Sequence, residues 1–213
     1  MPGTHSLDLM PGPQENVWLA ALRANPDHAR NYARRWSSLV AEGRDIYGEA
    51  RLIDAMAERG SSILDAGCGT GRIGGWLAER GHQVVGVDLD ETLIEVARRD
   101  WPQADWQVQN LAGLSLADES GNPAEFDLVV SAGNVLTFLS VDERLPALTQ
   151  LRQHLATDGR IVVGFGAGRG YGFDEFEADA DQAGLVLEQR YSTWTLRPPA
   201  ADFLVAVLAV RPH

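Results

Sequence analysis

The sequence predicts an α/β protein with a mostly parallel, seven-stranded sheet, one antiparallel strand, helices on both faces of the sheet and an N-terminal helical cap. Three observations support this fold class. Short runs rich in β-branched residues alternate with helical segments from residue 60 onward, which is typical of parallel strands covered on both faces. Before residue 60, apolar residues recur at spacings of three and four, as in helices. Two successive strands without a helix between them close the chain, so one strand should be reversed.

The N-terminal part of the chain is expected to be separate from the sheet. Residues 1–14 contain three prolines and no long apolar run, so we expect a loose leader and neither a secretory signal nor a membrane span. A cytoplasmic protein follows as the expectation. The leader and the helical cap together occupy residues 1–59, and Pro26 and Gly43 divide the helical stretch into two or three helices. Residues 60–213 are expected to form the main domain, in one structural unit with the cap.

Strands and helices alternate through most of the main domain. The segment after the first strand has Ile73, Trp76 and Leu77 on one helical face. The run Arg197-Pro198-Pro199 supplies the turn between the last two strands. The expected strands are residues 62–65, 83–88, 106–108, 126–131, 160–165, 185–195 and 202–210. The expected helices are residues 70–80, 91–99, 142–155 and 173–183.

Composition and charge limit the classes of function. The 213 residues are 45% hydrophobic and 23% charged, which suits a single globular unit with one substantial core. Lys plus Arg total 18 and Asp plus Glu total 30, so the formal net charge is −12. Because this charge repels polyanions, a nucleic-acid substrate is disfavoured. The one cysteine excludes an internal disulfide and a multi-thiolate metal site, and no metal is expected.

A glycine-rich turn follows the first strand of the main domain. Its sequence is Asp65-Ala66-Gly67-Cys68-Gly69-Thr70-Gly71. Glycine permits positive φ and the close approach of a ligand to the backbone, and the helix that follows presents unpaired N–H groups in its first turn. Ligands of open α/β sheets bind at the carboxyl ends of the strands, where this turn lies. The turn therefore predicts a nucleotide-type cofactor site.

Two cofactor classes fit this turn. Residues 69–74 satisfy the pattern G-x-G-x-x-G of dinucleotide sites, which would indicate a nicotinamide-dependent oxidoreductase. The pattern Asp65-x-Gly67-x-Gly69-x-Gly71 accounts for the acid and for three glycines. A carboxylate tolerates a cationic sulfonium cofactor but repels a pyrophosphate. We therefore favour S-adenosylmethionine, with Asp65 either in contact with it or capping the loop or the helix that follows.

The residues around the turn resemble a known family. Residues 63–71 are similar to motif I of the class I S-adenosylmethionine-dependent methyltransferases, and residues 84–90 resemble the second strand of that family. Residues 126–131 resemble its fourth-strand motif, and residues 151–160 resemble the helix and turn before strand five. The resemblance covers residues 60–210, and the helical leader resembles the cap of many members. It implies a Rossmann-like fold and a methyltransferase that releases S-adenosylhomocysteine.

The resemblance also implies a set of cofactor contacts. Asp88 holds the place of the acid that binds the ribose hydroxyls. Family members commonly bind the adenine amino group with an Asp after strand three, where this chain has Asn110, whose amide oxygen can accept the same bond. Cys68 is expected to contribute only its backbone. The implied cofactor positions are Asp65, Ala66, Gly67, Cys68, Gly69, Gly71, Asp88, Leu89, Asn110, Leu111, Ala132, Gly133 and Asn134.

The methyl acceptor is expected to be a small molecule. Tyr32 and Trp36, one helical turn apart in the cap, are candidates for an aromatic wall over the methyl donor, although such pairs more often only pack. Glycine at every second position of residues 164–172 marks a candidate substrate loop with Arg169 and Tyr171 as its reaching side chains; a plain flexible loop is the alternative. Asn134 suits the site or a turn equally well.

No residue of the sequence stands in a pattern that indicates a catalytic base. Methyl transfer at a sulfonium depends largely on the positioning of donor and acceptor, so this does not argue against an enzyme. It leaves a non-catalytic S-adenosylmethionine-binding or sensor module as a second alternative. Whether N, O, C or S receives the methyl group stays open. We expect a monomer or a homodimer.

Overall fold

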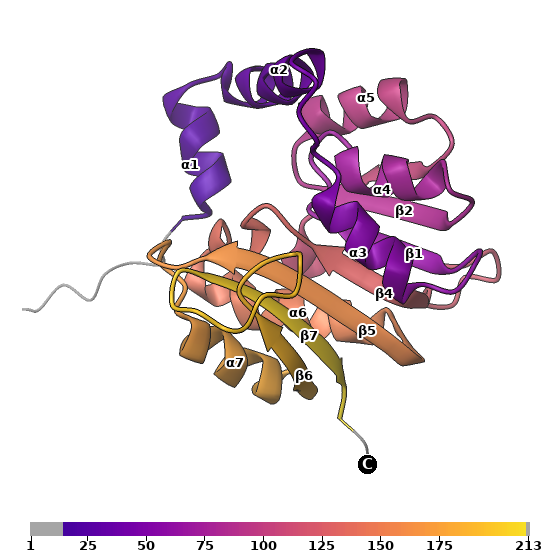
Figure 1. Cartoon of the computed structure of the whole chain (residues 1–213), viewed down its shortest axis with the longest axis vertical. Helices are drawn as coiled ribbons and strands as arrows, with labels where there is room; N and C mark the ends of the chain where they lie inside the picture. The colour runs from indigo at the N-terminus through magenta and orange to yellow at the C-terminus, as the bar shows by residue number, and fades with distance from the viewer. Residues whose placement is uncertain (1–14, 212–213) are drawn as a thin grey trace, which may run out of the picture.

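A seven-stranded sheet forms the centre of the computed structural model, which describes residues 15–211 (Figure 1). The leader expected at residues 1–14 lies outside the described residues. The strands are β1 (Ser62–Ala66), β2 (Gln83–Asp88), β3 (Asp105–Val108), β4 (Phe126–Ser131), β5 (Leu155–Gly166), β6 (Leu185–Tyr191) and β7 (Phe203–Val210).

The strand order is β3-β2-β1-β4-β5-β7-β6. Neighbouring strands from β3 to β5 pair in parallel, whereas β7 runs antiparallel to both β5 and β6. The predicted fold class is therefore confirmed, and β7 is the reversed strand expected from the closing strand pair. The chain winds outward in opposite directions from β1 and β4, and ligands of open α/β sheets bind at such a switch point.

Helices cover both faces of the sheet (Figure 1). On one face, Ile53 and Leu77 pack with Ile63 from the sheet, and on the other face Leu148 packs with Leu64. Because neighbouring residues of a strand point to opposite faces, a continuous apolar strand such as β1 serves both layers. The helices are α1 (Val17–Ala24), α2 (His28–Ala41), α3 (Gly48–Met56), α4 (Arg72–Ala78), α5 (Glu91–Asp100), α6 (Val141–Gln153) and α7 (Phe173–Gln182), with short 3-10 helices η1 (Leu111–Gly113) and η2 (Val135–Thr137).

The N-terminal helices divide into two groups. Ala50 and Ile53 of α3 are fully buried in the same cluster as the sheet residues, so α3 belongs to the layer formed with α4 and α5. α1 and α2 lie outside this layer, and Ala29 of α2 packs with Leu93 of α5 (Figure 1). The prediction of helices over residues 15–59 agrees with the structure, but a boundary after residue 59 separates α3 from the sheet that it covers.

The ends of the C-terminal strands differ from the expected ranges. β5 begins at Leu155 because Leu155 pairs with Phe126 across an irregularity in the β4–β5 register. β6 ends at Tyr191, and Trp194 beyond it packs on Gly164, where a Cβ would lie 2.3 Å from the indole ring. Among the described helices, none has the length and apolar character that crossing a membrane requires.

Candidate functional site

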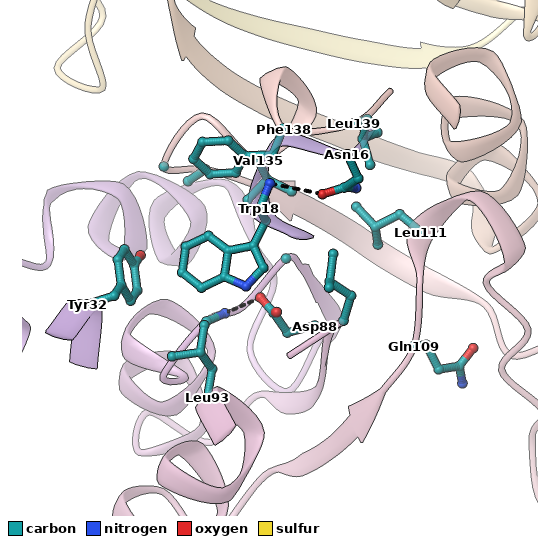
Figure 2. A pocket seen from close by; sticks show the side chains of 15 residues that line it. Asn16, Trp18, Tyr32, Asp88, Leu93, Gln109, Leu111, Val135, Phe138 and Leu139 are labelled. Atoms are coloured by element: carbon teal, nitrogen blue, oxygen red, sulfur yellow. Dashed lines mark hydrogen bonds between the residues drawn. The ribbon is translucent and has the colours of Figure 1, made fainter. Parts of the chain in front are cut away.

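A pocket lies at the carboxyl ends of β1, β2, β3 and β4, beneath α1 and α2 (Figure 2). Its volume is about 60 Å³, so the side chains of its lining fill most of the space at this position. The pocket therefore coincides with the switch point of the sheet. It is lined by Asn16, Trp18, Tyr32, Gly67, Gly69, Asp88, Leu89, Leu93, Gln109, Leu111, Ala132, Gly133, Val135, Phe138 and Leu139.

The glycine-rich turn forms one wall of this pocket. Gly67, Gly69 and Gly71 adopt φ values of 82°, 56° and 76°, which side-chain-bearing residues rarely adopt. A Cβ on Gly67 would lie 2.4 Å from Val135 Cγ1, so the turn presses directly against η2. The backbone N–H of Gly67 also donates to the carbonyl of Val87 at 2.8 Å. These contacts hold Gly67 and Gly69 at the pocket wall, whereas Gly71 lies outside it at the start of α4.

Asp88 ends β2 and lines the pocket. Its carboxylate accepts hydrogen bonds from the backbone N–H groups of Gly69 at 2.9 Å and Asp90 at 3.0 Å. Desolvation raises the pKa of Asp88 to about 6, although these two donors lower it. A carboxylate has about four acceptor positions, so two remain for hydroxyl donors of a ligand.

Asp65 lies behind the glycine-rich turn. Its side chain is 1% exposed, and Oδ2 accepts the backbone N–H of Gly74 in α4 at 2.8 Å. Burial raises the pKa of Asp65 to about 7, against the lowering effect of this hydrogen bond and of Arg72. Asp65 does not line the pocket, so the geometry favours the capping alternative. Its influence on a ligand would act through its charge.

The cap closes the pocket with aromatic side chains. Figure 2 shows Trp18 of α1 projecting into the pocket, where its indole Nε1 donates to Asp90 Oδ2 at 2.9 Å. The rings of Tyr32 and Phe138 lie 5.4 and 6.0 Å from the Trp18 ring, centroid to centroid. The backbone N–H of Val17 donates to the carbonyl of Phe138 at 2.7 Å. Asp90 also accepts the N–H of Leu93, and so caps α5.

The candidate acceptor residues separate in the structure. Tyr32 lines the pocket, whereas Trp36 lies outside it and stacks on the Arg72 guanidinium, 4.4 Å from the ring centroid. Tyr171 is 2% exposed, and its hydroxyl donates to Asp179 at 2.6 Å. Arg169 is exposed and does not line the pocket. The glycine-rich loop after β5 therefore does not reach the pocket, because its Tyr171 side chain is part of the core.

Two asparagines of the predicted site are engaged in local hydrogen bonds. Asn110 Oδ1 accepts the N–H of Ala112 at 2.9 Å, and its Nδ2 donates to Glu143. Asn134 has a φ of 69°, and its Oδ1 accepts the N–H of Gly166 at 2.9 Å, which joins the ends of β4 and β5. Neither lines the pocket, and the same holds for Ala66 and Cys68. The predicted positions that do line it are Gly67, Gly69, Asp88, Leu89, Leu111, Ala132 and Gly133.

Sequence reasoning missed the part of the pocket contributed by α1 and by the segment after β4. The available signal was Asn16 directly before an apolar helical run, which is typical of a helix N-cap. Such a signal predicts where a helix begins, but it does not predict which surface of the protein the helix covers. The unpredicted lining residues are Asn16, Trp18, Leu93, Gln109, Val135, Phe138 and Leu139.

Comparison with known proteins identifies similar domains. The model of the family described as "Methyltransferase domain" matches residues 63–159. The crystal structure of a TehB-like SAM-dependent methyltransferase from Corynebacterium glutamicum is 52% identical, with a TM-score of 0.83, and the match covers 88% of this chain and 100% of that one. The 1,6-didemethyltoxoflavin-N1-methyltransferase of Burkholderia thailandensis, solved with S-adenosylhomocysteine, shares the fold at 19% identity, with a TM-score of 0.68 over 98% of this chain and 99% of that chain.

Curated relatives match over shorter stretches. The ubiquinone biosynthesis O-methyltransferase of Idiomarina loihiensis is 44% identical over 72 residues, which are 33% of this chain and 29% of the relative. The corresponding enzyme of Azoarcus sp. is 37% identical over 70 residues, which are 33% of this chain and 30% of the relative. The chain thus spans less than a third of the length of these two relatives.

Proposed function

Because this chain belongs to the S-adenosylmethionine-dependent methyltransferases, we propose that it transfers a methyl group from S-adenosylmethionine to a small-molecule acceptor. One observation carries the proposal. The glycine-rich turn, the acid at the end of β2 and the aromatic side chains of the cap all line the same pocket at the switch point of the sheet. In one pocket, the turn thus offers exposed backbone to a cofactor, the acid offers acceptors for its hydroxyl groups, and the aromatic side chains cover it.

The residues of the pocket fit this cofactor. Gly67 and Gly69 expose backbone at the wall, Asp88 offers acceptors for ribose hydroxyls, and the side chains of Leu89 and Leu111 provide apolar surface for a base. When bound, the cofactor supplies an electrophilic methyl group on a sulfonium cation. The carboxylates of Asp65 and Asp88 beside the turn favour a cation over a pyrophosphate, which argues against the nicotinamide alternative.

The cap residues exclude water and restrict position. Trp18 and Tyr32 cover the pocket, and a Cβ on Gly69 would lie 3.4 Å from Tyr32 Cε1, so the Tyr32 ring packs closely over the turn. Burial raises the pKa of Tyr32, which keeps its hydroxyl neutral at physiological pH. Holding the donor and the acceptor close together and correctly oriented supplies much of the rate enhancement of a methyl transfer. Such catalysis does not need a dedicated base.

The charge of the protein and the cover over the pocket support a small acceptor. The net charge of −12 opposes binding of a nucleic acid, and α1 and α2 cover the pocket. A cytoplasmic location and a monomeric or homodimeric state are part of this proposal. Light scattering of the purified protein tests the oligomeric state.

Isothermal titration calorimetry with S-adenosylmethionine, S-adenosylhomocysteine and NADH tests the cofactor, and mass spectrometry of S-adenosylhomocysteine formed with pools of small metabolites tests the reaction. We expect binding of both adenosyl compounds, no binding of NADH and turnover with at least one pool. Binding of NADH alone contradicts the cofactor. Binding of S-adenosylmethionine without turnover in any pool favours the non-catalytic module.

A further inference from the structure

Glu143 joins three elements at the rim of the pocket. Its Oε2 accepts hydrogen bonds from Asn16 Nδ2 and from the backbone N–H of Ser140, both at 2.9 Å. Its Oε1 accepts Asn110 Nδ2 at 2.8 Å. Asn16 precedes α1, Asn110 follows β3, and Glu143 itself lies in the first turn of α6. One carboxylate therefore connects the residue before α1, the segment after β3 and the first turn of α6.

Helix capping explains only one of these three hydrogen bonds. Ser140 and Glu143 form a capping box, in which the acid three residues into the helix accepts the backbone N–H of the cap residue. The bonds from Asn16 and Asn110 lie outside that motif and cross 127 and 33 sequence positions. Their presence indicates a second role for the same carboxylate.

The two additional bonds fix the orientation of both amides. The NH₂ group of each asparagine faces Glu143, so each amide oxygen faces the other way. Asn16 Oδ1 accepts the N–H of Trp18 at 3.1 Å and so caps α1, and Asn110 Oδ1 accepts the N–H of Ala112. Glu143 thereby holds Asn110 with its NH₂ group toward the carboxylate and its acceptor oxygen away from it.

Glu143 is ionised at neutral pH. Partial burial raises the pKa of its carboxyl, but the hydrogen bonds from Asn110, Ser140 and Asn16 outweigh this and leave the pKa below its ordinary value. Hydrogen bonds to a charged acceptor are the stronger kind, so the contact with Asn16 is more than a surface polar pair.

We propose that Glu143 is a positioning residue that latches α1 closed over the cofactor pocket and orients Asn110 beside it. Asn16 begins the helix that carries Trp18 into the pocket, and Leu111, next to Asn110, lines the same pocket. Glu143 thus orients the Asn110 amide and contributes to closure of the cap, together with the Val17–Phe138 and Trp18–Asp90 hydrogen bonds. The consequence for cofactor exchange rests on the proposed function, whereas the latch itself does not.

Two variants that change the polar groups at the contact between Asn16 and Glu143 test the latch. Asn16→Asp keeps a good helix N-cap but places a second carboxylate against Glu143. We expect α1 amides of the free protein to exchange hydrogen faster, and S-adenosylhomocysteine to dissociate roughly tenfold faster, as loss of a charge-assisted bond predicts. Adding Glu143→Gln removes the repulsion between the two carboxylates, while its single amide oxygen replaces two accepting oxygens. The double variant should therefore exchange and release more slowly than Asn16→Asp alone.

Asp142→Asn is the matched control. Asp142 is exposed in the same helical turn, so its substitution removes one negative charge without touching the Glu143 bonds, and we expect wild-type rates. Wild-type exchange of α1 in Asn16→Asp, or no recovery in the double variant, overturns the latch. If the wild-type protein binds no S-adenosylhomocysteine, the cofactor proposal fails, and hydrogen exchange of α1 in the free protein still decides whether Glu143 latches the cap.

Discussion

Asp65 and Asp88 are carboxyl groups with raised pKa values beside a turn that forms one wall of the pocket. Desolvation is the largest cause in both, so each ionised group destabilises the free protein. Neither has an ion-pair partner among the described residues. A cation bound at the pocket would offset this cost, and the proposed cofactor is a cation. At each of these two residues, the same charge lowers the stability of the free protein and favours the binding of a cation.

Replacing Asp65 by Asn should stabilise the free protein. The Asn amide oxygen can still accept the N–H of Gly74, while the buried charge is lost. The folded pKa of about 7 lies above the ordinary value of 3.8, so Asp65 makes stability fall as pH rises through that interval. Asp65→Asn removes this dependence and gains at most about 4 kcal/mol above the folded pKa.

Urea unfolding of wild type and Asp65→Asn, at about pH 5 and about pH 8, measures this effect. The difference in free energy of unfolding should be larger at the higher pH. A variant that is less stable than wild type at about pH 8 would show that the carboxylate stabilises the turn after all.

Replacing Asp88 by Ala should weaken cofactor binding and leave the fold intact. Hydrogen bonds from ligand hydroxyls to a carboxylate are charge-assisted, and their loss raises the dissociation constant of S-adenosylhomocysteine roughly a hundredfold. Calorimetry measures the constant, and circular dichroism checks the fold. Asp105→Ala, at an exposed position on β3, is the control. Unchanged affinity in Asp88→Ala would refute the ribose assignment.

Local motifs made part of the site predictable. The glycine-rich turn and Asp88 are adjacent to single strands, so their place follows from the strand pattern alone. Trp18 and Phe138 meet across elements far apart in the chain, and no spacing encodes that contact. Tyr171 was expected at the substrate because glycines surround it, but its partner Asp179 lies in α7, and spacing does not show which way a loop side chain turns.

At the scale of elements, the strands were predictable because apolar β-branched runs have few other uses in a globular chain. The closing pair of strands predicted the reversed β7 because no helix separates the two strands in the sequence. The place of α3 was not predictable. An apolar helical face shows that Ala50 and Ile53 need a partner, but it does not distinguish a sheet from a neighbouring cap helix.

The turn after β1 tolerates only glycine at its first tight position. Gly67→Ala would strain a backbone with φ of 82° and place a Cβ 2.4 Å from Val135 Cγ1. We expect a loss of about 1–2 kcal/mol from the backbone and a further loss of about 1–3 kcal/mol from overpacking, with weaker S-adenosylhomocysteine binding. Urea unfolding and calorimetry measure the two effects.

Gly81→Ala separates the two causes. Gly81 has a φ of 89° with nothing within 4 Å of a Cβ, so only the backbone strain applies. It lies outside the pocket, and its substitution should leave cofactor affinity unchanged. Equal losses of stability in the two variants would contradict the proposed close approach of η2 to the turn.

At the scale of the whole molecule, the sheet and its two helical layers form a fixed base, and α1 and α2 form its cover. The base supplies the glycine-rich turn, Asp65 and Asp88, while the cover supplies Trp18 and Tyr32. The whole protein is acidic as well, with a net charge of −12, and this charge favours the approach of a cation. Stability and cofactor binding should therefore be coupled through pH.

We expect S-adenosylmethionine to stabilise the protein more as pH rises. In the free protein the pKa values of Asp65 and Asp88 are about 7 and about 6, so both bind protons in mildly acidic solution. A bound cation favours the ionised carboxylates, so binding releases protons and the affinity increases with pH across that interval. Urea unfolding with and without saturating S-adenosylmethionine measures this stabilisation, which should grow from about pH 5 to about pH 8. S-adenosylhomocysteine lacks the sulfonium charge, so its stabilisation should rise less, and Asp65→Asn should flatten the rise for both. A stabilisation that is independent of pH for both ligands would contradict an electrostatic role for the two acids.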